Sequence, residues 1–210
     1  VERLAAAFTE PQIKAAYARQ LASPDCRELE RYTRIFNYPE ESRVKTAADL
    51  DTLGIKAFFC SNVCAMYERE TYVNQGGFIR KTIFNEDMIY AGGLIKAGYA
   101  IAYAADARVI HSHNYSGLEQ FHRNFDLAVS QAEHPEIFGC VASEGEGIRL
   151  VKKTAVHCLR IRKPWLIVTL VWQSGWKFLG YRMGKSYRKL PRWLVLRCTM
   201  NRAYWNGYRR

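Results

Sequence analysis

The sequence has no cysteine motif. Its six cysteines include no Cys-x-x-Cys pair and form no dense framework; they are Cys26, Cys60, Cys64, Cys140, Cys158 and Cys198. This pattern excludes a zinc ribbon and a disulfide scaffold as the basis of the fold. We expect reduced thiols in a cytoplasmic protein.

An export signal and a long apolar run are also missing. The N-terminus has neither a basic segment nor an apolar signal core, so nothing in it targets the chain for export. Residues 165–172 are largely apolar, but a membrane-spanning helix needs about 20 such residues. Because the chain starts at Val1 and not with Met, inside what reads as a helix, we expect a fragment of a longer protein.

Acidic residues are absent from the C-terminal part. Residues 147–210 hold 16 of the 31 Lys and Arg residues and no Asp or Glu, whereas residues 1–146 hold all 20 acidic residues. The chain therefore divides into a mildly acidic domain, 1–146, and a basic, aromatic-rich tail, 147–210. Such a tail predicts a polyanionic partner, either a membrane surface or a nucleic acid.

The tail has the pattern of an amphipathic helix. Basic residues recur at helical spacing among aromatic and aliphatic ones, as expected for a helix that lies on an anionic membrane surface. A nucleic-acid-binding protein is the weaker alternative, because no recognisable nucleic-acid motif is present and the rest of the chain is acidic. The basic residues are Lys177, Arg182, Lys185, Arg188, Lys189 and Arg192.

The first 146 residues alternate between strand and helix patterns. With 49% hydrophobic and 24% charged residues the chain can bury a core, and the alternation predicts an α/β fold with helices on a mixed sheet. Polar residues 21–53 predict either a long loop with a helical turn or two, or a lid. The patterns predict strands over 13–17, 55–60, 100–104 and 108–111, and helices over 2–8, 65–73, 85–98 and 118–131.

Asp87 is the sharpest candidate for chemistry. Asn85 is a suitable N-cap, which places Glu86 and Asp87 in the first turn of the helix. A carboxylate there is kept ionised by the helix dipole and the free backbone amides, so it can accept a proton. The alternative is that both acidic residues only compensate the dipole.

His111 and His113 are candidate metal ligands. Side chains two residues apart at a strand end point to the same face and can share a site. No neighbouring carboxylate completes a ligand set, so a histidine pair with satisfied hydrogen bonds is the alternative.

Seven stretches, in this order and spacing, carry a family resemblance. They are Ala18-Arg19-Gln20, Phe36-Asn37-Tyr38-Pro39, the segment Ser61 to Tyr67, Gly76-Gly77-Phe78, Asn85-Glu86-Asp87, the segment Ala100 to Arg108, and the segment His111 to Tyr115. Together they resemble bacterial rhamnosyltransferases, which are inverting family 2 glycosyltransferases of the GT-A fold. The tail resembles the basic C-terminal region of the same family.

The resemblance implies roles for individual residues. Asp87, preceded by Glu86, stands at the position of the general base. His111, with His113 as second choice, stands where a histidine completes a Mg²⁺ or Mn²⁺ site together with an Asp-x-Asp motif. We expect Arg19 and Gln20 to line the cleft and Asn62 to bind a sugar hydroxyl; the alternatives are plain surface and a helix cap. Tyr67 and Phe78 are expected in the core.

The resemblance also implies a reaction and a place in the cell. The family transfers L-rhamnose from dTDP-L-rhamnose to a hydroxyl group of a lipid-linked glycan or polysaccharide, such as O-antigen, capsule or exopolysaccharide. An enzyme of this kind is expected at the inner face of the plasma membrane, held there by its tail.

The resemblance covers the acceptor side of the GT-A domain. The nucleotide-binding half with its Asp-x-Asp motif is expected to be missing from residues 1–210. A non-catalytic, membrane-associated remnant of such an enzyme is therefore the principal alternative.

Overall fold

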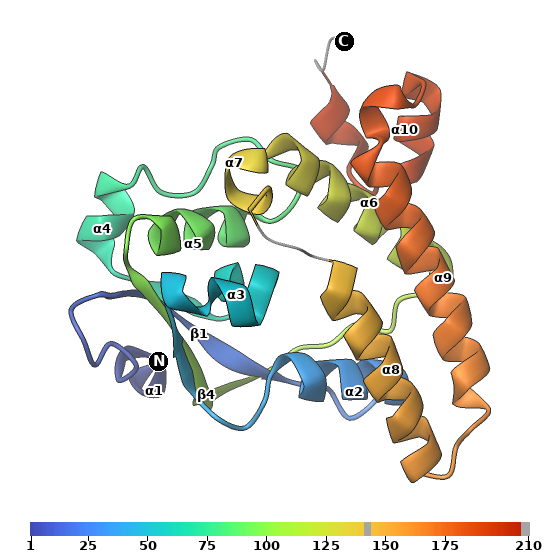
Figure 1. Cartoon of the computed structure of the whole chain (residues 1–210), viewed down its shortest axis with the longest axis horizontal. Helices are drawn as coiled ribbons and strands as arrows, with labels where there is room; N and C mark the ends of the chain where they lie inside the picture. Colours follow the sequence, from blue (N-terminus) through green and yellow to red (C-terminus); the bar gives the residue numbers. More distant parts are fainter. Residues whose placement is uncertain (141–143, 207–210) are drawn as a thin grey trace. The chain divides into compact units, whose positions relative to one another are not determined.

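The computed structural model describes residues 1–140 and 144–206 (Figure 1). They form two compact units: Val1–Ile79, Glu86–Asn114 and Cys140–Leu150 make the first, and Arg80–Asn85, Tyr115–Gly139 and Val151–Arg210 the second. The predicted boundary near residue 146 lies within helix α8 (Glu144–Arg160). The last four residues of the predicted tail, 207–210, lie outside the described residues.

The first unit is built on a four-stranded mixed sheet. Strands β2 (Arg43–Lys45), β4 (Ala100–Ile110), β1 (Ile13–Leu21) and β3 (Ala65–Tyr67) lie in this order. β1 and β4 are parallel, and the two outer strands are antiparallel to their neighbours. The predicted mixed α/β architecture is therefore confirmed.

Alternation along the two central strands separates small from large side chains. Ala16 and Ala18 of β1 join alanines of β4 in a cluster that includes Leu4 of helix α1 (Glu2–Ala5). Tyr17 and Tyr103, with ring centroids 5.2 Å apart, stand at intervening positions of the two strands. Because side chains alternate across a strand, the alanines share one face and the tyrosines the other.

Two predicted elements have a different form. Residues 55–60, predicted as a strand, form a 3₁₀ helix, η2 (Gly54–Phe58), since a short apolar run does not distinguish a strand from a buried helical turn. Residues 65–73, predicted as one helix, form β3 and then α4 (Arg69–Asn74). Glu68 accepts hydrogen bonds from the amides of Glu70 and Thr71, so the helix starts only after it.

The segment 21–53 holds more regular structure than the predicted loop with a helical turn or two. It contains α2 (Glu28–Asn37), β2, a 3₁₀ turn η1 (Ala47–Asp49) and α3 (Leu50–Leu53). The strands expected over 100–104 and 108–111 are one strand, β4. Its pairing with β1 slips where the break was expected: Ala18 pairs with Ala104, but Arg19 pairs with Arg108. At this irregularity three residues of β4, 105–107, have no partner on β1.

Helix α5 (Glu86–Lys96) confirms the prediction of a helix over 85–98. The residue before it, Asn85, is buried and has a left-handed φ of 62°. Its side-chain amide donates to the backbone carbonyl of Leu127. Asn85 thus turns the chain into the helix whose first residues are Glu86 and Asp87.

The second unit is helical (Figure 1). Helix α6 (Gly117–Glu133) begins at a capping box between Ser116 and Glu119 and confirms the prediction of a helix over 118–131. It packs against α9 (Leu166–Lys185). The remaining elements are α7 (Pro135–Phe138), the second part of α8, η3 (Tyr187–Lys189), α10 (Arg192–Cys198) and η4 (Arg202–Trp205).

Within residues 1–140 and 144–206, none of the helices combines the length and the apolar character needed to cross a bilayer.

Candidate active site

Asp87 lies in the first turn of α5 and is held by two backbone amides. The amide of Met88 donates to Oδ1 at 2.7 Å, and the amide of Asn62 donates to Oδ2 at 3.2 Å. The neighbouring Glu86 accepts from the side-chain amide of Asn62 at 3.3 Å. The loop between η2 and β3 therefore faces the acidic start of α5.

Burial sets the proton affinity of Asp87. Burial raises the pKa of this carboxyl to about 6, the Asn62 amide lowers it and the Glu86 carboxylate raises it again. Loss of water therefore outweighs the backbone amides that favour the ionised form. The carboxylate is mostly ionised at neutral pH and more basic than an ordinary aspartate, which suits a general base.

Asn62 is occupied by protein contacts. Besides its bonds to the acidic pair, its Oδ1 accepts a hydrogen bond from the Tyr67 hydroxyl at 2.7 Å. The Tyr67 hydroxyl also lies 3.5 Å from the Cys60 sulfur. Tyr67 was expected only in the core. The polar residues Ser61 and Asn62 precede it in the same motif, and they were the sequence signal that its hydroxyl would find a hydrogen-bond partner.

Gln20 approaches the same loop from the end of β1. Its side-chain amide donates to Ser61 Oγ at 2.7 Å, and its carbonyl accepts from Arg34 at 2.7 Å. Arg34 in turn pairs with Glu30 one helical turn earlier on α2. Sequence reasoning missed Arg34, because its segment was read as a loop.

Arg19 lies beside Gln20 but has another partner. Its guanidinium donates to Glu40 at 2.8 Å, and its side chain is only 10% exposed. Because Arg19 and Gln20 are both buried, the alternative of a plain surface pair is excluded for this position. The prediction that both line the substrate cleft remains a prediction.

His111 and His113 come together just beyond β4. Their rings contact edge to face with centroids 4.5 Å apart, and the His111 amide donates to the Leu21 carbonyl. The structure thus brings the two predicted ligands side by side, and their role at a metal remains a prediction. Among the described residues, no group of three or more His, Cys, Asp or Glu side chains is arranged to hold a metal.

An Asp-x-Asp triplet is present in the chain. It is Asp49-Leu50-Asp51, so the expectation that residues 1–210 lack this motif is wrong. Asp49 forms a capping box with Thr46 and an ion pair with Arg43. Burial raises its pKa, but the hydrogen bonds from Thr46 and Arg43 outweigh this and lower it overall. Asp49 therefore serves the local turn, and Asp51 is exposed.

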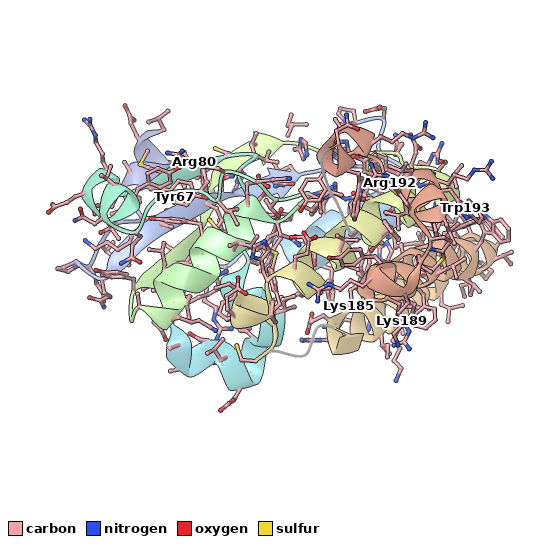
Figure 2. The ribbon with its side chains drawn as sticks, turned by 90° about the horizontal axis from the view of Figure 1, so that it is seen from above. Tyr67, Arg80, Lys185, Lys189, Arg192 and Trp193 are labelled. Atoms are coloured by element: carbon pink, nitrogen blue, oxygen red, sulfur yellow. The ribbon has the colours of Figure 1, made fainter. Side chains whose placement is uncertain are left out.

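The basic residues of the tail lie on α9, η3 and α10 of the second unit. Lys177 is half-buried and the other five predicted residues are exposed; Figure 2 shows Lys189 and Trp193 at the outside of this unit. Several are held by neighbours: Arg188 Nε donates to the Tyr187 hydroxyl, and Arg192 donates to the Trp205 carbonyl. The prediction that the basic tail is helical is therefore confirmed.

A mixed α/β unit that presents a basic carboxylate at a helix start is consistent with a glycosyltransferase, and comparison with known proteins supports this class. The chain is 40% identical to the O-antigen chain rhamnosyltransferase RfbN of Salmonella typhimurium and 39% identical to the O-antigen chain rhamnosyltransferase WbaN of Salmonella anatum. Each alignment covers 99% of the chain. The chain belongs to this rhamnosyltransferase family.

The chain spans 66% of the length of each of these relatives. No protein-family model matches it, and no solved structure matches it significantly.

Proposed function

We propose that this protein, at the full length of its relatives, is an inverting rhamnosyltransferase. It moves L-rhamnose from dTDP-L-rhamnose to a hydroxyl group of a lipid-linked glycan. The observation that carries the proposal is the 40% identity to an O-antigen chain rhamnosyltransferase over nearly the whole chain. The half-buried carboxylate at the start of α5 supports it independently.

In this proposal Asp87 is the general base. Its carboxylate takes the proton of the acceptor hydroxyl while that oxygen forms a bond to the anomeric carbon. The bond from the anomeric carbon to the diphosphate oxygen breaks on the opposite face, so the configuration inverts. The amides of Met88 and Asn62 fix the orientation of the carboxylate, and burial, together with the Glu86 carboxylate, keeps its proton affinity high.

We propose further that His111 contributes one ligand to a Mg²⁺ or Mn²⁺ ion, with His113 beside it. A bound divalent ion neutralises charge on a departing diphosphate. His111→Ala should raise the Mn²⁺ concentration needed for half-maximal transfer at least tenfold, the usual scale for a lost ligand contact. His113→Ala tests the second candidate ligand in the same way. An unchanged metal requirement in both variants would remove the pair from this role.

Transfer assays test the reaction itself. The protein at the length of its relatives is incubated with a lipid-linked glycan and either dTDP-L-rhamnose or dTDP-glucose. We expect transfer of rhamnose only, with an anomeric configuration opposite to that of the donor. Transfer of glucose at a comparable rate, or retention of configuration, contradicts the proposal. If the protein is folded but completely inactive, the alternative of a non-catalytic remnant of such an enzyme is favoured.

We propose that the second unit attaches to an anionic membrane surface through α9 and the residues after it. Val168, Trp172 and Leu179 are 75%, 64% and 47% exposed and are spaced so that they lie on one face of α9. Ile167, Val171 and Trp176 join them in lining an apolar groove along this helix. A continuous exposed apolar surface of this kind is typical of an interaction site.

Charge points to anionic lipid as the partner. The exposed cations Arg182, Lys185, Arg188, Lys189 and Arg192 follow the apolar face, and residues 147–210 contain no acidic residue. Aromatic and aliphatic side chains can enter the headgroup boundary while cations contact phosphates. The cytoplasmic leaflet carries anionic lipid, so we place the protein on the inner face of the plasma membrane.

Vesicle co-sedimentation of the 210-residue chain tests this attachment. Binding to phosphatidylglycerol vesicles should be strong at low salt, weaker at high salt and weakest with phosphatidylcholine. The double variant Lys185→Gln with Lys189→Gln should bind about tenfold to thirtyfold more weakly, since each cation near the surface contributes about 1 kcal/mol. Arg27→Gln with Arg69→Gln in the first unit is the control. Indifference to both lipid charge and salt would contradict the proposal and mean that the tail instead packs on the catalytic domain or a protein partner.

A further inference from the structure

Tyr67 links the loop that faces Asp87 to the sheet, in addition to the hydrogen bond from Gln20 of β1 to Ser61. Asn62 is exposed and lies in a short connection between η2 and β3. Its backbone amide holds Asp87, its side-chain amide holds Glu86, and its side-chain carbonyl accepts from Tyr67. Tyr67 belongs to β3, where it pairs with Ala15 of the central strand β1. The Tyr67 hydroxyl therefore connects Asn62 to the sheet.

The ring of Tyr67 is fixed by an aromatic cluster. Its centroid lies 6.0 Å from that of Tyr72, 5.2 Å from that of Phe78 and 5.4 Å from that of Tyr90. Tyr90 lies one turn after Asp87 on α5. The same side chain thus packs its ring on the helix that carries Asp87 and directs its hydroxyl (Tyr67 is labelled in Figure 2) to the loop that holds Asp87.

We propose that Tyr67 is a positioning residue for Asp87 and acts through Asn62. The proposal rests on the role of Asp87 proposed above, but its geometry belongs to residues of the first unit alone. Without the hydroxyl, the Asn62 side chain keeps only its hydrogen bond to Glu86. The hydrogen bond from the Asn62 backbone amide to Asp87 Oδ2 then lengthens or breaks. The carboxylate then loses a donor that favours its ionised form.

Tyr67→Phe tests the proposal, because it removes only the hydroxyl and keeps the ring in the cluster. The pKa of Asp87 is followed by NMR of its labelled carboxyl in the 210-residue chain, which requires no catalytic turnover. We expect an upward shift of about half a unit or more, as for the loss of one hydrogen bond to a carboxylate. In the protein at the length of its relatives, kcat should fall while KM for the donor stays constant, and the acidic limb of the pH profile should move upward.

Tyr90→Phe is the matched control. Tyr90 belongs to the same aromatic cluster, but its buried hydroxyl has no hydrogen-bond partner among the described residues. This variant should leave the titration of Asp87 unchanged. A shift of equal size in both variants would mean that general loosening of the cluster, and not the Tyr67 hydroxyl, is responsible, and this would overturn the proposal.

A double-mutant cycle identifies the route. Asn62→Ala should shift the titration of Asp87 by itself, and adding Tyr67→Phe should then have no further effect. A full additional shift in the Asn62→Ala background, or an unchanged titration in folded Tyr67→Phe, overturns the proposal. If Asp87 proves not to be the base, transfer survives its replacement while these titration results still stand, so the two failures are distinguishable.

Discussion

Asp87 is an aspartate whose proton affinity is set by its surroundings more than by its place on the helix. A first-turn carboxylate is expected to be a weak base, since the dipole and the amides favour its ionised form. Burial reverses this and raises its pKa to about 6. The sequence pattern could identify the residue, but it could not predict the sign of the shift, which depends on how the segment 60–67 covers the helix start.

The raised pKa predicts a pH dependence of transfer. A general base works only when ionised, so kcat/KM should fall about tenfold per pH unit below pH 6 and level off above it. A steady-state pH profile of the protein at the length of its relatives checks this. An acidic limb near pH 4 would mean that Asp87 titrates as an ordinary exposed carboxyl or is not the base.

At the scale of elements, sequence patterns succeeded where the local signals agreed. Helix α6 has a capping box and amphipathic spacing, and α5 has acidic residues in its first turn; both were predicted. The predictions for segments 55–60 and 65–73 were wrong because tertiary contacts decide whether these residues form helix or strand. Residues 65–67 become an edge strand only because β1 lies alongside them. Nothing in their local composition reports that partner.

The contact between α6 and α9 predicts opposite effects for two glycines of one helix. A Cβ atom at Gly180 would lie 2.2 Å from the carbonyl oxygen of Phe121, whereas one at Gly175 meets nothing within 4 Å. Gly180→Ala should therefore lower the free energy of unfolding by about 1–3 kcal/mol through forced separation of the helices. Gly175→Ala should raise it by about 0.5–1 kcal/mol through helix propensity. Urea denaturation followed by tryptophan fluorescence measures both, and equal signs would contradict this packing.

At the scale of the whole molecule, a second buried carboxyl makes stability depend on pH. Asp126 of α6 accepts hydrogen bonds from Thr199 and Met200, but burial raises its pKa to about 6 from an ordinary value of 3.8. Between these values the folded state binds more protons than the unfolded state. Stability therefore falls as pH rises through that window and stays lower above it.

Tryptophan fluorescence can isolate this effect, because all five tryptophans lie in the second unit. The urea midpoint should be higher at pH 5 than at pH 7, and Asp126→Asn should remove most of the difference. A midpoint that rises between pH 5 and pH 7 would show that Asp126 is not the controlling group.

The central claim is that Asp87 removes the proton of the acceptor hydroxyl, and one measurement tests it most directly. Single-turnover transfer is compared between the wild-type protein at the length of its relatives and Asp87→Asn, with Glu86→Gln as the neighbouring control. We predict that Asp87→Asn binds donor normally, folds normally and transfers sugar about 10²–10⁴-fold more slowly, while Glu86→Gln loses much less. Transfer by Asp87→Asn at the wild-type rate would contradict the account.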